Sequence, residues 1–240
     1  MTTSLQVDYY AKPNRVAYQN GLAIQFFRQA SHLMLEVFNL VCVRGTRRLF
    51  KNLNFSSQEG ELLELRGPNG SGKTSLLRIL CGLATPAAGE VRWQGKNIRS
   101  LGEEYYGHIV YLGHQNAVKD ELSAVENLRI SSAVAGHVLS QGEALEILRR
   151  VGLSQQQNLP ARVLSAGQRR RLGMTRLLTA RATLWILDEV LTSLDDTAVN
   201  LSREFIGEHL KNGGMAIVAT HQDLNLKAPR MQRLELSGPG

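Results

Sequence analysis

The first part of the sequence shows apolar residues in alternation with polar ones. Residues 34–66 follow a pattern of strand, turn, strand and strand, in which Leu49, Leu53 and Phe55 alternate with polar partners. Alternation of this kind is typical of half-exposed antiparallel strands. Residues 89–95 form a further short strand pattern. The region before residue 66 therefore predicts antiparallel strands.

Farther along the chain, apolar strand patterns alternate with helix patterns. Strands are predicted at 61–66, 108–113, 183–187 and 215–220, and helices at 74–83, 165–181 and 196–211. This alternation is typical of parallel strands joined by right-handed crossovers, so the pattern predicts an α/β fold.

Residues 123–151 change character and become helical. Ser123 with Glu126, and Ser140 with Glu143, each have the spacing of a capping box, and Gly152 is a suitable helix stop. We predict an inserted helical lobe over about 116–170.

Residues 1–33 differ from the rest of the chain. They contain a single acid, Asp8, and residues 1–16 have no apolar core of the signal-peptide type. Met34 then begins a plain strand pattern. We expect a domain over 34–240 and an N-terminal extension over 1–33 that is not native; the alternative is an ordered or targeting extension. N-terminal sequencing of the native protein distinguishes the two.

Composition narrows the classes of function. The chain has 240 residues, a net charge of +7 and only 6% aromatic residues, and its arginines occur in small groups. Because no arginine-rich, aromatic-interleaved stripe is present, we expect no nucleic-acid partner. No run approaches the roughly 18–20 apolar residues of a membrane helix, so any spanning is expected from another chain. Cys42 and Cys81 form no C-x-x-C pair and are expected to be buried thiols, a haem-ligand role being the weaker alternative.

A glycine-rich turn between a strand and a helix carries the strongest chemical signal. Gly67 to Thr74 fits G-x-x-x-x-G-K-[ST] at every fixed position. Its glycines let the amides curl toward one point, which the N-terminus of the following helix also faces. The pattern predicts binding of a nucleoside triphosphate and Mg²⁺, the hydroxyl of Thr74 being a metal ligand. The expected contacts are Gly67, Pro68, Asn69, Gly70, Ser71, Gly72, Lys73, Thr74 and Ser75.

Further polar residues follow predicted strands or open a helix. Asp188 and Glu189 end an apolar strand, so Asp188 could hold Mg²⁺ and Glu189 could polarise the attacking water. Ser165, Gly167 and Gln168 open a long helix with capping-box spacing and could form a second anion-binding surface. Gln115 could ligate Mg²⁺ or orient water, and His221 could contact the γ-phosphate.

In these motifs the sequence resembles the ATP-binding subunits of ABC transporters, over residues 34 to about 236. The matching segments, in order, are 67–74 (Walker A), Gln115 (Q-loop), 164–168 (signature), 184–189 (Walker B), 193–195 (D-loop) and His221 (switch histidine). The resemblance implies a RecA-like P-loop NTPase core with an antiparallel β subdomain and a helical signature subdomain. It also implies a head-to-tail dimer that holds ATP between Lys73 of one copy and Ser165 of the other, with Asp195 at the site.

A narrower resemblance is to the ATPases of the haem-export systems of cytochrome c maturation. It is carried by segments such as 89–93, 111–115, 119–128 and 220–224. It implies coupling of ATP hydrolysis to haem handling with integral membrane permease subunits, at the cytoplasmic face of a bacterial inner membrane. The alternatives are an ABC ATPase for another exported substrate, such as a lipid or a peptide, and a soluble ABC protein outside transport.

Three positions depart from the family pattern. Arg44 stands where an aromatic residue usually stacks on adenine, and a guanidinium can also stack on a purine. Ala166 replaces the commoner glycine of the signature. Val190 replaces the usual proline after Glu189, which frees a backbone donor and is expected to loosen the path to Asp195.

Overall fold

The computed structural model describes residues 34–113, 117–190, 196–221, 224–226 and 228–237, and the expected extension over 1–33 lies outside them. An antiparallel sheet is formed by β1 (Met34–Arg44), β2 (Arg47–Gln58), β4 (Ala88–Trp93) and β5 (Lys96–Asn97), in the order β2-β1-β4-β5. Along β2 the apolar side chains of Leu49, Leu53 and Phe55 are buried and alternate with exposed ones. The predicted antiparallel pairing is confirmed for β1, β2 and β4. It is wrong for the strand over 61–66, which is buried on both faces and belongs to a second, parallel sheet.

A second sheet is parallel throughout the described strands. It contains β6 (Ile109–Leu112), β7 (Leu184–Asp188), β8 (Met215–Ala219), β3 (Glu61–Arg66) and β9 (Arg230–Glu235), in that order. The predicted α/β fold with parallel strands is confirmed. Strand β9 was not predicted, because one of its two buried positions is the polar Gln232, which hides the apolar alternation.

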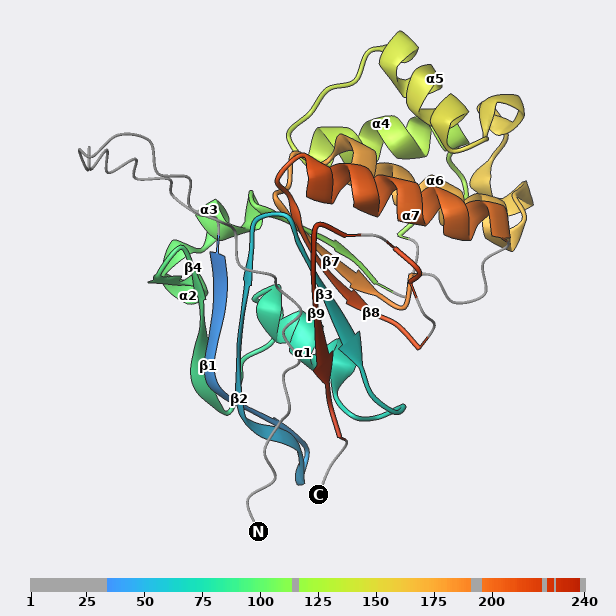
Figure 1. Ribbon diagram of the computed structural model, residues 1–240. Helices are drawn as coiled ribbons and strands as arrows, with labels where there is room; N and C mark the ends of the chain where they lie inside the picture. The colour runs from blue at the N-terminus through green and yellow to red at the C-terminus, as the bar shows by residue number, and fades with distance from the viewer. Residues whose placement is uncertain (1–33, 114–116, 191–195, 222–223, 227, 238–240) are drawn as a thin grey trace, which may run out of the picture.

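Helices cover both faces of the parallel sheet (Figure 1). Helix α1 (Lys73–Leu80) lies between the two sheets, where Leu76 and Leu77 join one core with residues of β1, β3 and β7. The other face packs against a second core that includes residues of α4 (Ala124–Val134), α5 (Gln141–Arg150), α6 (Ala166–Thr179) and α7 (Asp196–Lys211). Short helices complete the described chain: α2 (Ile98–Leu101), α3 (Glu103–Tyr106), η1 (Ser154–Gln156) and η2 (Ala161–Val163).

The predicted helix boundaries follow from local capping. Ser123 caps α4, Ser140 caps α5 and Ser165 caps α6. Each makes both hydrogen bonds of a capping box. Gly152, which follows the C-cap residue Val151 of α5, has a φ of 67°, as expected of a helix stop. In the part of the chain that the structure describes, no helix combines the length and apolarity that crossing a membrane requires.

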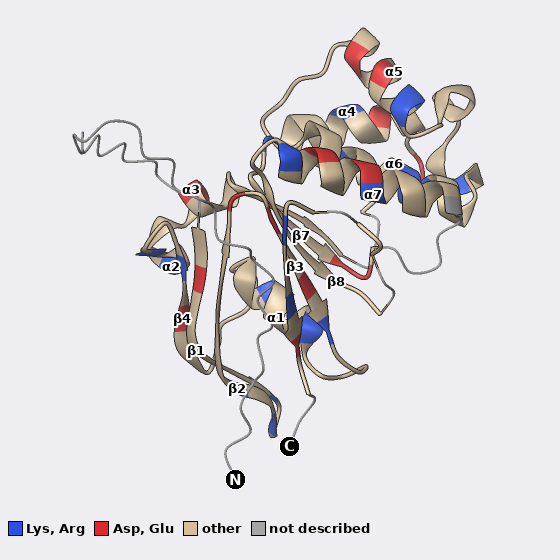
Figure 2. Ribbon diagram, viewed as in Figure 1, with Lys and Arg blue, Asp and Glu red and all other residues tan. Residues whose placement is uncertain are grey.

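Acidic and basic side chains are mixed on the helices (Figure 2), and both cysteines are buried. Figure 2 shows basic and acidic residues on the same helices, α5 and α7 among them. Cys42 and Cys81 are both buried free thiols, as predicted, and burial raises the pKa of Cys81 to about 12. Burial also raises the pKa of Cys42, so neither thiol is ionised near neutral pH.

His209 on α7 is held in its neutral form by its surroundings. Its ring stacks on Trp185 at 3.9 Å, and its Nε2 lies 3.1 Å from the carbonyl oxygens of both Thr183 and Met215. Burial lowers the pKa of His209 below its ordinary value of 6.5, and the two carbonyl groups oppose this shift in part.

The shift predicts a loss of stability in mild acid. Because the pKa of His209 is lower in the folded chain, the unfolded chain binds the proton more readily. The contribution of neutral His209 to the free energy of unfolding is therefore complete above about pH 6.5, and it is lost as the pH falls toward the folded-state pKa. We expect His209→Gln to flatten the dependence of the free energy of unfolding on pH between about pH 7 and 5, measured by urea unfolding. His137→Gln is the matched control; an unchanged slope for His209→Gln would contradict the assignment.

Candidate functional site

The turn between β3 and α1 forms a cradle of backbone amides. Gly67 has a φ of 143° and Gly72, the residue before the helix, a φ of 104°. A Cβ on Gly67 would overlap the carbonyl oxygen of Leu236, so the loop can pass this point only with a glycine. The amides at the start of α1, with the positive end of the helix dipole behind them, are therefore suited to bind an anion.

Lys73 lies inside this cradle and is 5% exposed. Its ammonium group donates hydrogen bonds to the carbonyl oxygens of Gly67, at 2.8 Å, and Pro68, at 3.2 Å. Burial lowers the pKa of Lys73, while the carboxylates of Glu189 and Asp188 raise it. The cation is thus already positioned where an anionic ligand of the cradle would lie.

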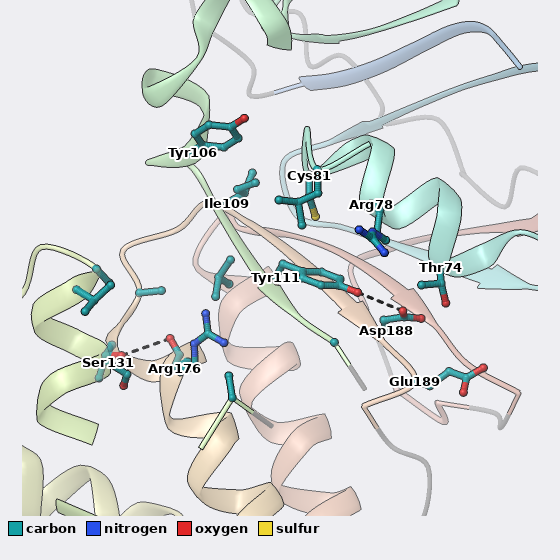
Figure 3. Close-up of a pocket in the computed structure, with 18 residues that line it drawn as sticks. Thr74, Arg78, Cys81, Tyr106, Ile109, Tyr111, Ser131, Arg176, Asp188 and Glu189 are labelled. Carbon is teal, nitrogen blue, oxygen red and sulfur yellow. Dashed lines mark hydrogen bonds between the residues drawn. The ribbon is translucent and has the colours of Figure 1, made fainter. Parts of the chain in front are cut away.

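A carboxylate from β7 reaches the same place. Asp188, 3% exposed, accepts a hydrogen bond from the Tyr111 hydroxyl at 3.3 Å through Oδ2, whereas Oδ1 has no hydrogen-bond partner among the described residues. Figure 3 shows the Tyr111 hydroxyl turned to Asp188, with the Thr74 side chain beside them. Burial raises the pKa of Tyr111 above its ordinary value, and the negative charge of Asp188 raises it further. An oxygen without a partner at this depth is suited to a cation.

Glu189 is held in an uncommon backbone conformation beside these groups. Its φ is 52°, and its amide donates to the carbonyl oxygen of Ala219 on β8 at 3.0 Å. Its Oε1 lies 3.0 Å from His221 Nε2 and 4.0 Å from Lys73 Nζ. A left-handed non-glycine residue is costly and persists only when its neighbours fix it, a feature frequent at functional sites.

Two cavities meet at this site in the described structure. One, of about 170 Å³, is lined by the cradle together with Arg44 and Leu49; the other, of about 1160 Å³, extends past Tyr111 and Arg176. Thr74 and Glu189 line both. The structure thus brings together Arg44, Lys73, Thr74, Asp188, Glu189 and His221 from the predicted set.

The remaining predicted residues fall into two groups. Ser165 is exposed at the start of α6, where its Oγ accepts a hydrogen bond from the amide of Gln168 at 3.2 Å. It does not line either cavity of this copy. Gln115 and Asp195 lie outside the described residues.

Two residues at the site were not predicted. Tyr111 contacts an aspartate 77 positions away, which no local pattern reveals. Arg170 is 7% exposed and donates to the carbonyl oxygens of Val190, Glu189 and Gly113. Its signal in the sequence is a charge on the apolar face of a helix, in line with Met174 and Leu177.

The chain is similar to ATP-binding proteins of ABC transporters. The family model described as "ABC transporter" matches residues 50–192. The "Cytochrome c biogenesis ATP-binding export protein CcmA" of Nitrosospira multiformis is 53% identical over 203 residues, which cover 85% of this chain and 98% of that protein. The protein of the same name from Nitrosomonas europaea is 52% identical, covering 85% and 96%.

Solved structures agree with the fold. A putative ABC transporter ATP-binding protein from Pyrococcus furiosus has a TM-score of 0.73 at 23% identity, covering 84% of this chain and 97% of that one. An ATP-binding cassette solved as a dimer in a post-hydrolysis state with ADP and Pi has a TM-score of 0.72 at 23% identity, covering 86% and 97%. The P-loop NTPase fold of the ABC type is thereby confirmed.

The packing of the cradle predicts a strict requirement for glycine at position 67. We expect Gly67→Ala to lower the free energy of unfolding by at least about 1 kcal/mol, because the methyl group would overlap the Leu236 carbonyl. Gly142→Ala, in α5 with open space around the added methyl group, is expected to be neutral or stabilising. Denaturant unfolding measures both; equal stability of the two variants would contradict the close approach.

Proposed function

This chain belongs to the ABC transporter family, and we propose that it is the ATP-hydrolysing subunit of a haem-export complex that serves cytochrome c maturation. The observation that carries the proposal is the 53% identity to a cytochrome c biogenesis ATP-binding export protein over 98% of that protein's length. The chain is an ABC-type ATPase. Haem as cargo is the further step that we propose.

The geometry supports roles for the residues around the cradle. We propose that the backbone N–H groups of residues 69–75 and the ammonium group of Lys73 bind the β- and γ-phosphates. We propose that Glu189 accepts a proton from the attacking water and that His221, whose Nε2 lies 3.0 Å from Glu189 Oε1, holds the glutamate carboxylate in position.

The residues present also fit Mg²⁺. The unpartnered Oδ1 of Asp188 and the hydroxyl of Thr74 are oxygen donors, and the described residues contain no cluster of three His, Cys, Asp or Glu side chains that could hold a metal alone. This composition suits a cation that shares its coordination with phosphate oxygens and water. When bound, Mg²⁺ would neutralise charge that develops on the phosphates. We propose Asp188, Thr74 and Gln115 as its protein ligands.

A second copy of the chain is proposed to complete the nucleotide site. Ser165 is exposed and lines neither cavity of its own copy, so the surface at the start of α6 is open to another copy. Ser165, Gly167 and Gln168 at the start of α6 offer the complementary anion-binding surface. We propose a head-to-tail dimer in which they, with Asp195, contact the ATP bound to the other copy.

Membrane permease subunits are the other proposed partners, at the cytoplasmic face of a bacterial inner membrane. The cavity of about 1160 Å³ has exposed apolar residues at its rim, namely Leu83, Tyr106 and Val134. Such a rim favours an apolar element of another protein.

We propose the subdomain boundaries as predicted, with the helical subdomain over about 116–170.

Deletion of the gene tests the function in the cell. We expect loss of c-type cytochromes by haem staining, restored by the wild-type gene but not by Glu189→Gln. Co-purification of a hydrophobic membrane subunit would support the transport role. Normal c-type cytochromes in the deletion strain would refute the haem assignment.

Two substitutions test the catalytic roles in the purified protein. We expect Glu189→Gln to bind ATP normally and to lower kcat by about 100-fold or more, because the amide is not a base. Lys73→Ala should weaken both binding and turnover, since it removes the buried cation. Fluorescent nucleotide binding and phosphate release measure the two effects. Glu146→Gln, at an exposed position of α5, is the control; wild-type turnover by Glu189→Gln would remove Glu189 as the base.

Arg44 is proposed to stack on the adenine. It lines the cradle cavity with Leu49, and an exposed cation–π contact is worth about 0.5–1 kcal/mol. Arg44→Ala should therefore raise KM for ATP about two- to fivefold with little change in kcat. Arg44→Tyr should restore KM, whereas Arg47→Ala on the same hairpin should leave it unchanged. An unchanged KM for Arg44→Ala would place the base elsewhere.

A further inference from the structure

Three consecutive arginines of α6 have different environments. Arg169 donates to the carbonyl oxygen of Ala161 at 3.0 Å and pairs with Asp120, and Arg171 donates to that of Val151 at 3.1 Å. Both bind within the helical lobe. Arg170 is the buried member, and its hydrogen bonds lead toward the parallel sheet.

The guanidinium group of Arg170 joins the ends of two strands. Its Nε donates to the carbonyl oxygen of Val190 at 3.2 Å, and one terminal nitrogen to that of Glu189 at 3.4 Å, both directly after β7. The other terminal nitrogen donates to the carbonyl oxygen of Gly113, directly after β6, at 3.2 Å. One planar group thus binds three carbonyl oxygens on two segments.

Glu189 needs such a constraint. Its φ of 52° is unfavourable for a residue with a side chain, and the residue after it, Val190, is not a proline that would restrict the chain. The Ala219 carbonyl fixes the Glu189 amide from one side, and Arg170 holds the Glu189 carbonyl from the other. Because the fork of an arginine is rigid, it fixes distances that a lysine ammonium cannot.

We propose that Arg170 is a positioning residue for ATP hydrolysis, which sets the backbone of Glu189 and ties it to the start of the segment that carries Gln115. The inference rests on the proposed role of Glu189. Ser165 is the N-cap residue of α6 and Arg170 lies five residues farther along, about 7.5 Å along the helix axis. The helix that offers Ser165 to the nucleotide of a second copy therefore also holds the catalytic glutamate of its own copy.

Turnover of Arg170 variants tests the proposal. We expect Arg170→Ala to lower kcat about 10- to 100-fold, with KM and nucleotide binding within about twofold of wild type, because a displaced base costs rate rather than affinity. Arg170→Lys should recover part of the rate. Arg169→Ala and Arg171→Ala, which remove equal charge from the same helix, should stay within about twofold of wild type.

A double-mutant cycle separates positioning from a general structural role. If Arg170 acts through Glu189, adding Arg170→Ala to Glu189→Gln should lower kcat little further. A full, multiplicative loss in the double variant would overturn the proposal, as would wild-type kcat in Arg170→Ala. Failure of Arg170→Ala, Arg170→Gln and Arg170→Lys all to fold, seen as loss of the thermal transition, would also overturn it. Wild-type turnover by Glu189→Gln alone would instead refute the proposed base.

Discussion

The register of three parallel strands determines where the chemistry of this protein can occur. Leu65 of β3 pairs with Ala219 of β8, and Ala219 also pairs with Asp188 of β7. The three strands therefore end at one level, and the residues that follow them must emerge side by side. Since parallel strands point the same way, the cradle, Glu189 and His221 reach one edge although more than 150 positions separate Gly67 from His221.

Several charged groups are buried at this edge, and their arrangement matches what a triphosphate brings. Lys73 is buried near two carboxylates, and Asp188 keeps one oxygen without a hydrogen-bond partner among the described residues. In isolation such groups cost stability. Phosphate oxygens would accept from Lys73, and a divalent cation would use the free oxygen of Asp188. The local cost is thus consistent with selection for binding rather than for stability alone.

The sequence predicted what depends on neighbouring residues. The cradle, the three capping boxes and the buried strand before Asp188 each have a local pattern, and all were found. Contacts made by tertiary packing were not predicted: Tyr111 with Asp188, His221 with Glu189 and Arg170 with three carbonyl groups. Strand β9 was missed because Gln232 takes a position where an apolar residue signals burial. Its pairing with β3 is reinforced instead by Arg233, which binds Glu64 at 2.8 Å across the two strands.

The contacts of Arg170 change how the departure at Val190 is interpreted. A proline at this position would fix φ by its ring, and a valine leaves that freedom to the chain. In the structure, Val190 is 3% exposed and its carbonyl oxygen accepts from Arg170. The buried Val190 side chain and the hydrogen bond from Arg170 to the Val190 carbonyl oxygen both restrict this segment. A proline would restrict the same segment through its own ring. We infer that Val190 and Arg170 act as a pair: the constraint on the backbone of Glu189 comes from α6 rather than from a proline ring in the chain. The position of Glu189 then depends on how α6 packs against the sheet. A proline at position 190 would restrict the chain without that dependence.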